Sequence, residues 1–158
     1  MTSPHARLRE LGFELPVPPA ALASYVPTRL VSIGEGRSLL YIAGQVSTRD
    51  GKRLTGRCPD EVSVEQAQDA ARACALNILA QMESAAGLDN VEQVMQLNGF
   101  VLSTDDFGDQ PKVINGASDL IVEVLGEAGK HSRVALGANA LPFSVTVEIA
   151  AVAVVRTR

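Results

Sequence analysis

Two charged residues, Arg133 and Glu148, lie in a C-terminal stretch, SRVALGANALPFSVTVEIAAVAVV, that is otherwise almost entirely small or apolar. A carboxylate in apolar surroundings costs free energy unless it is paired or hydrogen-bonded. The planar guanidinium of arginine can hold a carboxylate through two hydrogen bonds, and a partly desolvated glutamate can position a water molecule and take its proton. The two residues therefore indicate either a buried ion pair between strands or a site where a small carboxylate reacts with water.

The stretch from residue 143 to residue 155 alternates as a β-strand does, and both of its faces are apolar. One face is formed by Val145, Val147, Ile149, Ala151, Ala153 and Val155, and the other by Thr146, Glu148, Ala150, Val152 and Val154. A strand with two apolar faces is typical of a sheet that is covered on both sides. Glu148 is therefore expected to be held away from bulk water.

The strongest helix prediction covers residues 64–86. Ser63 is the expected N-cap, Gln66 completes a capping box, and Gly87 follows the last turn. The small residues of the inward stripe suit a helix that lies close to a sheet, and Cys74 within it is expected to be a core residue rather than a nucleophile. This stripe consists of Ala67, Ala71, Cys74, Ile78 and Met82.

The remaining elements predict a single α+β domain, residues 1–158, in which residues 1–27 form an N-terminal arm. A short helix at HARLRELG precedes a proline-rich stretch, and a hairpin is expected around Gly34-Glu35-Gly36. Further strands are expected at VEQVMQLNGFVLS and at residues 133–137 and 143–155, with a second helix at 111–125. This β-β-α-β-α-β-β order favours a mixed sheet with both helices on one face, so a second copy of the chain is expected to cover the other face.

Composition excludes several other classes of protein. The net charge of −4 with scattered Lys and Arg gives no basis for general nucleic-acid binding, and aromatic residues, at 4%, are too few for base stacking. The cysteines Cys58 and Cys74 and the histidines His5 and His131 show no zinc-site spacing, so we expect no metal and no disulfide. His131 is expected to be solvated. No apolar run is long enough to span a bilayer, and the N-terminus lacks an apolar signal region, so we expect a cytoplasmic protein without membrane contact.

Three segments together resemble the Rid family, also called the YjgF family. In RVALGANALPFSVTVEI, Arg133 stands nine residues before Pro142 and Glu148 six residues after it, as in the family's C-terminal signature. LLYIAGQVS is similar to the family's strand that ends in Ser/Ala-Gly-Gln, and AAGLDNVEQVMQLNGFV is similar to its segment after the first long helix. The resemblance covers about residues 20 to 156 and is specific as a set.

This resemblance implies a chorismate-mutase-like α+β fold, a homotrimer, and ligand sites in the clefts between subunits. The best-known members hydrolyse reactive 2-imino acids, formed from enamines that pyridoxal-phosphate enzymes release, to 2-keto acids and ammonia, and they require no cofactor. We therefore expect a 2-imino acid deaminase without a cofactor. Its expected partners are a small 2-imino or 2-keto acid and further copies of the chain.

The expected roles divide the reaction between the two charged residues. Arg133 is the expected anchor of the substrate carboxylate, and Glu148 is expected to handle the attacking water. One position departs from the family: the best-known members carry a cysteine two residues after the arginine, where this chain has Ala135. An imine is already activated toward water, so this change bears on substrate range and rate more than on the class of reaction.

Three further residues are expected near the ligand. Gly44 has no Cβ, so the backbone there can approach a ligand closely, although a strand bulge would explain it equally well. Tyr25 and Asn115 match family pocket positions more loosely. Tyr25 could instead pack the arm onto the sheet, and Asn115 could be a polar residue of a helix surface.

Two other functions fit the same sequence. A non-catalytic trimer could bind a small carboxylate or keto acid through Arg133, as a sensor or regulator. An endoribonuclease or translation inhibitor, a label often attached to the family, is the weaker alternative because the acidic balance provides no basic groove.

Overall fold

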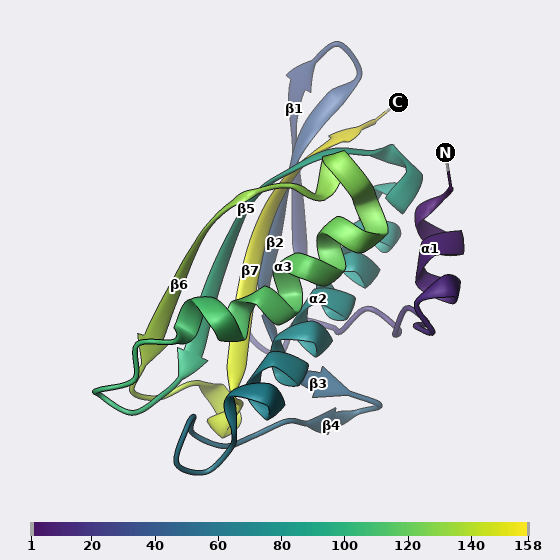
Figure 1. Ribbon diagram of the computed structural model, residues 1–158. Coiled ribbons are helices and arrows are strands. Elements are labelled where there is room, and N and C mark those ends of the chain that lie inside the picture. Colours follow the sequence, from purple (N-terminus) through teal and green to yellow (C-terminus); the bar gives the residue numbers. More distant parts are fainter. Residues whose placement is uncertain (1, 158) are drawn as a thin grey trace.

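A computed structural model describes residues 2–157 of the protein and contains a twisted five-stranded sheet (Figure 1). Across the sheet the order is β1 (Thr28–Gly34), β2 (Arg37–Val46), β7 (Val147–Arg156), β5 (Val91–Leu102) and β6 (Ser132–Ala138). Neighbouring strands are antiparallel except β5 and β6, which are parallel. The sheet is therefore mixed, as predicted, and β7, which carries Glu148, lies at its centre.

Two long helices, α2 (Val64–Ala86) and α3 (Gln110–Leu125), pack side by side on one face of this sheet (Figure 1). The short α1 (Pro4–Glu10) lies against this helical layer. Strands β3 (Thr48–Arg49) and β4 (Lys52–Arg53) form a small separate hairpin, and 3-10 turns occupy η1 (Leu88–Asn90), η2 (Gly126–Gly129) and η3 (Pro142–Ser144). The predicted order of strands and long helices is confirmed.

The start and end of α2 follow from its local sequence. The Ser63 hydroxyl accepts a hydrogen bond from the Gln66 amide at 3.1 Å, and the Gln66 side chain accepts one from the Ser63 amide at 2.8 Å. Gly87 ends the helix with φ of 84°, a conformation that favours glycine. The predicted inward stripe, including Cys74, is fully buried, so this prediction is confirmed.

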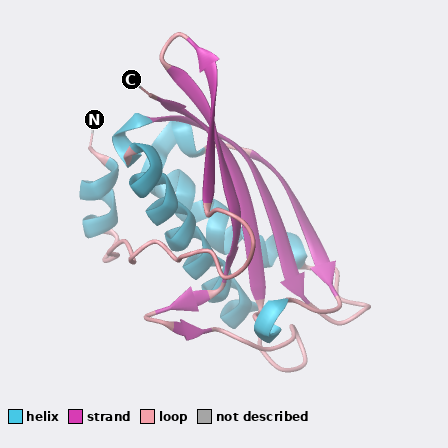
Figure 2. Ribbon diagram, turned by 180° about the vertical axis from the view of Figure 1, so that it is seen from behind, coloured by secondary structure: helices cyan, strands magenta, loops and turns pink. Residues whose placement is uncertain are grey.

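The two faces of the sheet differ in what covers them. On the helical face, Val147, Ile149, Ala151, Ala153 and Val155 of β7 are 0–2% exposed and form the centre of the core. On the other face, no helix of the described chain packs against the strands (Figure 2). The side chains that point out of that face are partly exposed and largely apolar; they include Val31, Tyr41, Val134 and Leu136, at 39–51% exposure.

One predicted element was wrong in its first part. The strand expected at 143–155 begins only at Val147, because Phe143 and Ser144 adopt φ of 57° and 56° and form part of the 3-10 turn η3. Val145 makes only an isolated bridge to Thr55. Residues 142–144 thus form an exposed turn before the strand, only Val145 and Thr146 of the predicted extension are buried, and the turn brings Phe143 to the same cavity as the arm.

The contact between the two long helices depends on a glycine. A Cβ on Gly116 of α3 would lie 2.2 Å from the backbone oxygen of Gln68 in α2, so the helices would have to separate. Alanine is the better helix former by about 1 kcal/mol, but overpacking a core costs about 1–3 kcal/mol. The clash is with the backbone, which cannot rotate away, so the net effect of an alanine at position 116 on the stability of the fold should be unfavourable.

We therefore expect Gly116→Ala to lower the free energy of unfolding by about 1–2 kcal/mol. Gly108→Ala is the matched control, since nothing lies within 4 Å of a Cβ at that position. Urea denaturation followed by circular dichroism measures both variants. A Gly116 variant as stable as the control would contradict the close-packing account.

Candidate functional site

A cavity of about 320 Å³ opens beside the end of β2 and the start of β7. Its lining comes from the N-terminal arm, from β2 and its continuation, and from the turn before β7. The residues that line it include Pro19, Leu22, Tyr25, Gly44, Pro142, Phe143 and Glu148. Apart from Glu148, the side chains of this set are apolar or aromatic, so the cavity surrounds one carboxyl group with a largely apolar wall.

Glu148 projects from the face of β7 opposite the helices and packs directly over Gly44. A Cβ on Gly44 would lie 2.5 Å from the Glu148 Oε1, so a side chain there would force the carboxyl group to move. The register between β2 and β7 shifts between Ile42 and Gln45, so Gly44 also lies in a bulge. The bulge interpretation of this glycine is confirmed, the close approach of a ligand stays a prediction, and the closest group to a Cβ at this position is the Glu148 side chain.

The electrostatic environment of Glu148 favours its neutral form. The side chain is half-buried, and within residues 2–157 neither an ion pair nor a hydrogen bond to the carboxyl group contributes to its pKa. Burial in this position raises the pKa of the Glu148 carboxyl above its ordinary value of 4.5, because the charged form loses contact with water. A carboxyl group with a raised pKa in a cavity can exchange a proton nearer to neutral pH than an exposed one.

The arm and the turn form the other walls of the cavity. The Gln81 side chain of α2 donates a hydrogen bond to the Pro19 carbonyl at 2.7 Å, and the Leu22 amide donates to the Tyr25 hydroxyl at 3.4 Å. These bonds hold the arm across the cavity. On the other side, the Arg53 guanidinium lies 3.6 Å from the ring centroid of Phe143, within the range of a cation–π contact.

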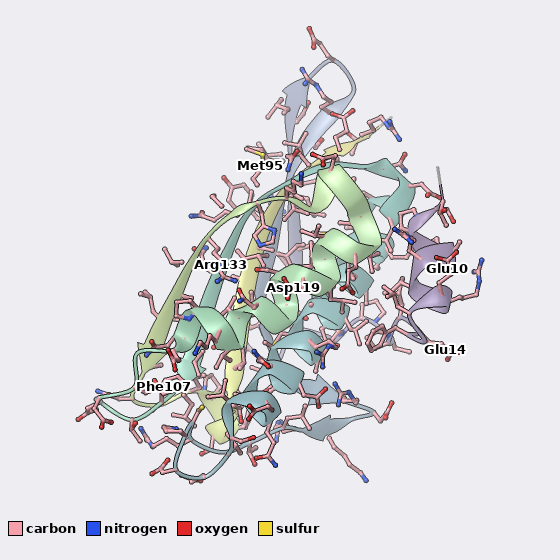
Figure 3. The ribbon with its side chains drawn as sticks, viewed as in Figure 1. Glu10, Glu14, Met95, Phe107, Asp119 and Arg133 are labelled. Atoms are coloured by element: carbon pink, nitrogen blue, oxygen red, sulfur yellow. The ribbon has the colours of Figure 1, made fainter. Side chains whose placement is uncertain are left out.

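Arg133 belongs to a second hollow, of about 330 Å³, between α3 and β6. Its side chain reaches from β6 toward α3 (Figure 3), where it donates to the Ser118 hydroxyl at 2.9 Å and to the Pro111 carbonyl at 3.0 Å. Asn115 lines the same hollow and is exposed. Ala135 lies two residues along β6 on the same side, partly buried against the core.

The two hollows cannot serve one small molecule within a single chain. Strand β5 separates β6 from β7, with Leu97 opposite Arg133 and Phe100 opposite Glu148. Leu97 is buried under the helices, whereas Phe100 faces the other way, so Arg133 and Glu148 lie on opposite faces of the sheet. Their Cα atoms are roughly 14 Å apart by strand spacing and rise. They form no ion pair in the described chain, and the buried-pair interpretation is wrong for one subunit.

Sequence reasoning missed two residues beside Arg133. His131 is not the solvated residue that was expected: it is half-buried, and both ring nitrogens lie within hydrogen-bond distance of a partner. Ser118 connects it to Arg133. Two spacings could have indicated them. Ser118 lies one helical turn after Asn115, and His131 stands two residues before Arg133, directly before β6 begins at Ser132.

Comparison with known proteins agrees with this architecture. Residues 5–153 match the family model described as "YjgF/chorismate mutase-like, putative endoribonuclease". The chain belongs to this family. Protein TCP17 of Trypanosoma cruzi, also a family member, is 42% identical over 147 residues, which cover 91% of this chain and 89% of that protein.

Two solved structures of YjgF-family relatives show how far the similarity extends. Atu1372 from Agrobacterium tumefaciens is 46% identical, with a TM-score of 0.85 over 96% of this chain and 92% of that one. TdcF from E. coli, solved with bound serine, is 27% identical, with a TM-score of 0.59 over 89% of this chain and 94% of that one. The resemblance seen in the sequence is thus confirmed at the level of family and fold.

The structure also bears on metals and membranes. Within residues 2–157, no three His, Cys, Asp or Glu side chains are grouped as metal ligands would be. Cys58 and Cys74 are free and buried. None of the described helices is long and apolar enough to cross a membrane.

The raised pKa of Glu148 predicts the sign of a stability change. In the folded chain the carboxyl resists ionisation, so its contribution to stability is complete below pH 4.5 and is lost as pH rises through the raised pKa. Glu148→Gln removes the charge at every pH. We therefore expect this variant to melt at or above the temperature of the parent at pH 7, and the difference to shrink as pH falls toward 4.

Differential scanning calorimetry between pH 4 and pH 7.5 measures this effect. Glu92→Gln, at an exposed position of β5, is the control and should show little dependence on pH. A Glu148 variant that melts well below the parent at pH 7 would show that the ionised carboxylate stabilises the folded protein, and would contradict a carboxyl group whose pKa is raised by desolvation.

Proposed function

We propose that the protein hydrolyses 2-imino acids to 2-keto acids and ammonia, in clefts between the subunits of a homotrimer. The observation that carries the proposal is the Glu148 carboxyl: it is half-buried and unpaired, it has a raised pKa, and it lines a cavity with a glycine beneath it. A group of this kind suits proton transfer to and from water. The family resemblance supplies the reaction class.

The proposed chemistry needs one carboxyl group and one water molecule. As the water oxygen attacks the carbon of the protonated imine (C=NH2+), the Glu148 carboxylate takes a proton from that water, and the C=N double bond becomes a single bond to a neutral amine. The same proton then passes to the nitrogen, giving a carbinolamine that carries a protonated amine. When Glu148 takes the hydroxyl proton, the C=O bond forms, the C–N bond breaks, and ammonia leaves. The carboxyl finally releases that proton to solvent.

Arg133 is the proposed anchor for the carboxylate of the substrate. Two of its five N–H groups are used by Ser118 and Pro111, and the other three have no partner within residues 2–157. A planar guanidinium with free N–H groups fits a carboxylate better than a lysine does. The apolar walls formed by Leu22, Pro142 and Phe143 favour imino acids with apolar side chains.

Assembly follows from the same proposal. Arg133 and Glu148 face opposite sides of one sheet, so both can contact one small substrate only if they come from different copies of the chain. The face opposite the helices carries exposed apolar side chains that a second copy would cover. We therefore propose that Arg133 and Asn115 of one subunit meet Glu148, Gly44 and Tyr25 of a neighbour.

A non-catalytic binding protein is the second candidate. It is favoured by two observations: TdcF of E. coli was solved with bound serine, and Ala135 stands where the best-known family members carry cysteine. Both functions use the same anchor. Ammonia release from imino acids separates them, because a binder would not accelerate it.

Two substitutions should affect different kinetic constants. Glu148→Gln keeps the size of the side chain but removes the base, so kcat should fall by about 10²–10⁴-fold with KM little changed. Arg133→Lys replaces a planar guanidinium with a point charge. Losing one charge-assisted hydrogen bond should weaken substrate binding by about 1.5–3 kcal/mol, which should appear mainly as a higher KM.

The assay measures ammonia release from 2-imino acids that an amino-acid oxidase generates in the same solution. Wild-type protein should accelerate the release, and rates across several amino acids should increase for apolar side chains. No acceleration by wild-type protein would reject the enzyme and favour the binding trimer. Normal turnover by Glu148→Gln would remove Glu148 from the reaction.

A further inference from the structure

A chain of hydrogen bonds leads from Arg133 into the protein. The Arg133 Nη1 donates to the Ser118 Oγ at 2.9 Å, and Ser118 Oγ lies 2.9 Å from the Nε2 of His131. The Nδ1 of His131 lies 2.6 Å from the carbonyl oxygen of Gly129. Gly129 is buried where η2 ends, so the last partner in this chain is fixed backbone.

The chemistry of these groups fixes the direction of the first and last bonds, and the direction of the bond between Ser118 and His131 follows for a neutral imidazole. A carbonyl oxygen only accepts, so the proton between Gly129 and His131 is on Nδ1. In a neutral imidazole Nε2 is then an acceptor, and the Ser118 hydroxyl donates to it. A guanidinium only donates, so a lone pair of the Ser118 Oγ accepts the hydrogen bond from Arg133. The order is therefore Arg133 to Ser118 to His131 to Gly129, with each donor matched to an acceptor.

A second contact holds the other terminal nitrogen of the Arg133 guanidinium. The Arg133 Nη2 donates to the Pro111 carbonyl at 3.0 Å, in the first turn of α3. Ser118, further along the same helix, holds Nη1. With both terminal nitrogens held by one rigid helix, the plane of the guanidinium is fixed. Prior ordering of a binding group reduces the conformational entropy lost when a ligand arrives.

We propose that Ser118 and His131 are positioning residues that hold Arg133 ready for the carboxylate of a ligand. This inference rests on the proposed function only in taking a 2-keto or 2-imino acid as the ligand. Ser118 acts on Arg133 directly, and His131 acts through Ser118 by fixing where the hydroxyl proton points. Neither residue touches the reacting atoms, so their loss weakens binding and leaves the chemical step nearly intact.

The test measures the affinity of the intact, assembled protein for 2-oxobutanoate by isothermal titration calorimetry. Ser118→Ala should weaken binding about threefold to tenfold, which is the range for one lost hydrogen bond. Ser118→Thr keeps a hydroxyl and should restore most of the affinity. His131→Gln keeps an acceptor near the position of Nε2 and should bind better than His131→Ala.

Matched controls come from the same strand and from the other histidine. Ser132→Ala removes a neighbouring hydroxyl that donates to the Met95 carbonyl on the opposite face of β6. His5→Gln removes a histidine that pairs with Glu83, far from Arg133 in the fold. Both should bind 2-oxobutanoate as wild type does. Affinities of Ser118→Ala and His131→Ala equal to those of the controls would overturn the proposal.

A second readout needs no ligand and no activity. In nitrogen-15 NMR spectra of wild-type protein, His131 should show a protonated Nδ1 and an unprotonated, hydrogen-bonded Nε2. Ser118→Ala should shift the Nε2 signal and speed the exchange of the Arg133 guanidinium protons. Unchanged spectra would contradict the chain of bonds. Failure of ammonia release alone would reject the proposed function and leave this inference standing.

Discussion

The alternation of side chains along a β-strand is the constraint on which the candidate site depends. Because successive residues point to opposite faces, Leu97 under the helices fixes the direction of Arg133, and Phe100 on the open face fixes that of Glu148. No rotamer change can bring the two charged groups together within one subunit. The proposed assembly with a second copy of the chain would both complete the site and cover the open face of the sheet.

The two halves of the site are built in different ways. Around Glu148, space comes from a missing side chain, because Gly44 has no Cβ beneath the carboxyl group. The apolar side chains of Leu22 and Phe143 line the cavity and limit the contact of this carboxyl group with water. Desolvation then raises its pKa without any charged neighbour. Around Arg133, the protein provides polar contacts, and the Ser118 hydroxyl and the Pro111 carbonyl hold the guanidinium. One half is suited to moving a proton and the other to holding an anion.

Features encoded by neighbouring residues could be predicted from the sequence. The start and end of α2 follow from Ser63, Gln66 and Gly87, all within one helix and its caps, and the buried stripe follows from helical periodicity. The turn at Phe143 could not be predicted, because neither Phe143 nor Ser144 is a glycine or asparagine, the residues whose presence signals a positive φ.

The candidate site could be predicted only in part, because it depends on pairing between strands that are far apart in the sequence. The sequence indicated Arg133 and Glu148 as the important charges, but their relative direction depends on β5 lying between their strands. For the same reason His131 seemed to be a solvated residue, since its partner Ser118 is on another element. Residue type and spacing identified the groups, and only the fold shows which of them meet.

Mixing subunits tests most directly the central claim that Arg133 and Glu148 act from different copies. Arg133→Lys and Glu148→Gln chains, each of which should release little ammonia at substrate concentrations below KM, are unfolded together in equal amounts, refolded and assayed at such a concentration, beside wild-type protein treated identically. In a trimer with three shared sites, half of the chains supply the arginine and half of their neighbours supply the glutamate, so about a quarter of wild-type ammonia release should return. If the refolded mixture stays as inactive as its parents while refolded wild type regains its activity, both residues must act from one chain, and the account is wrong.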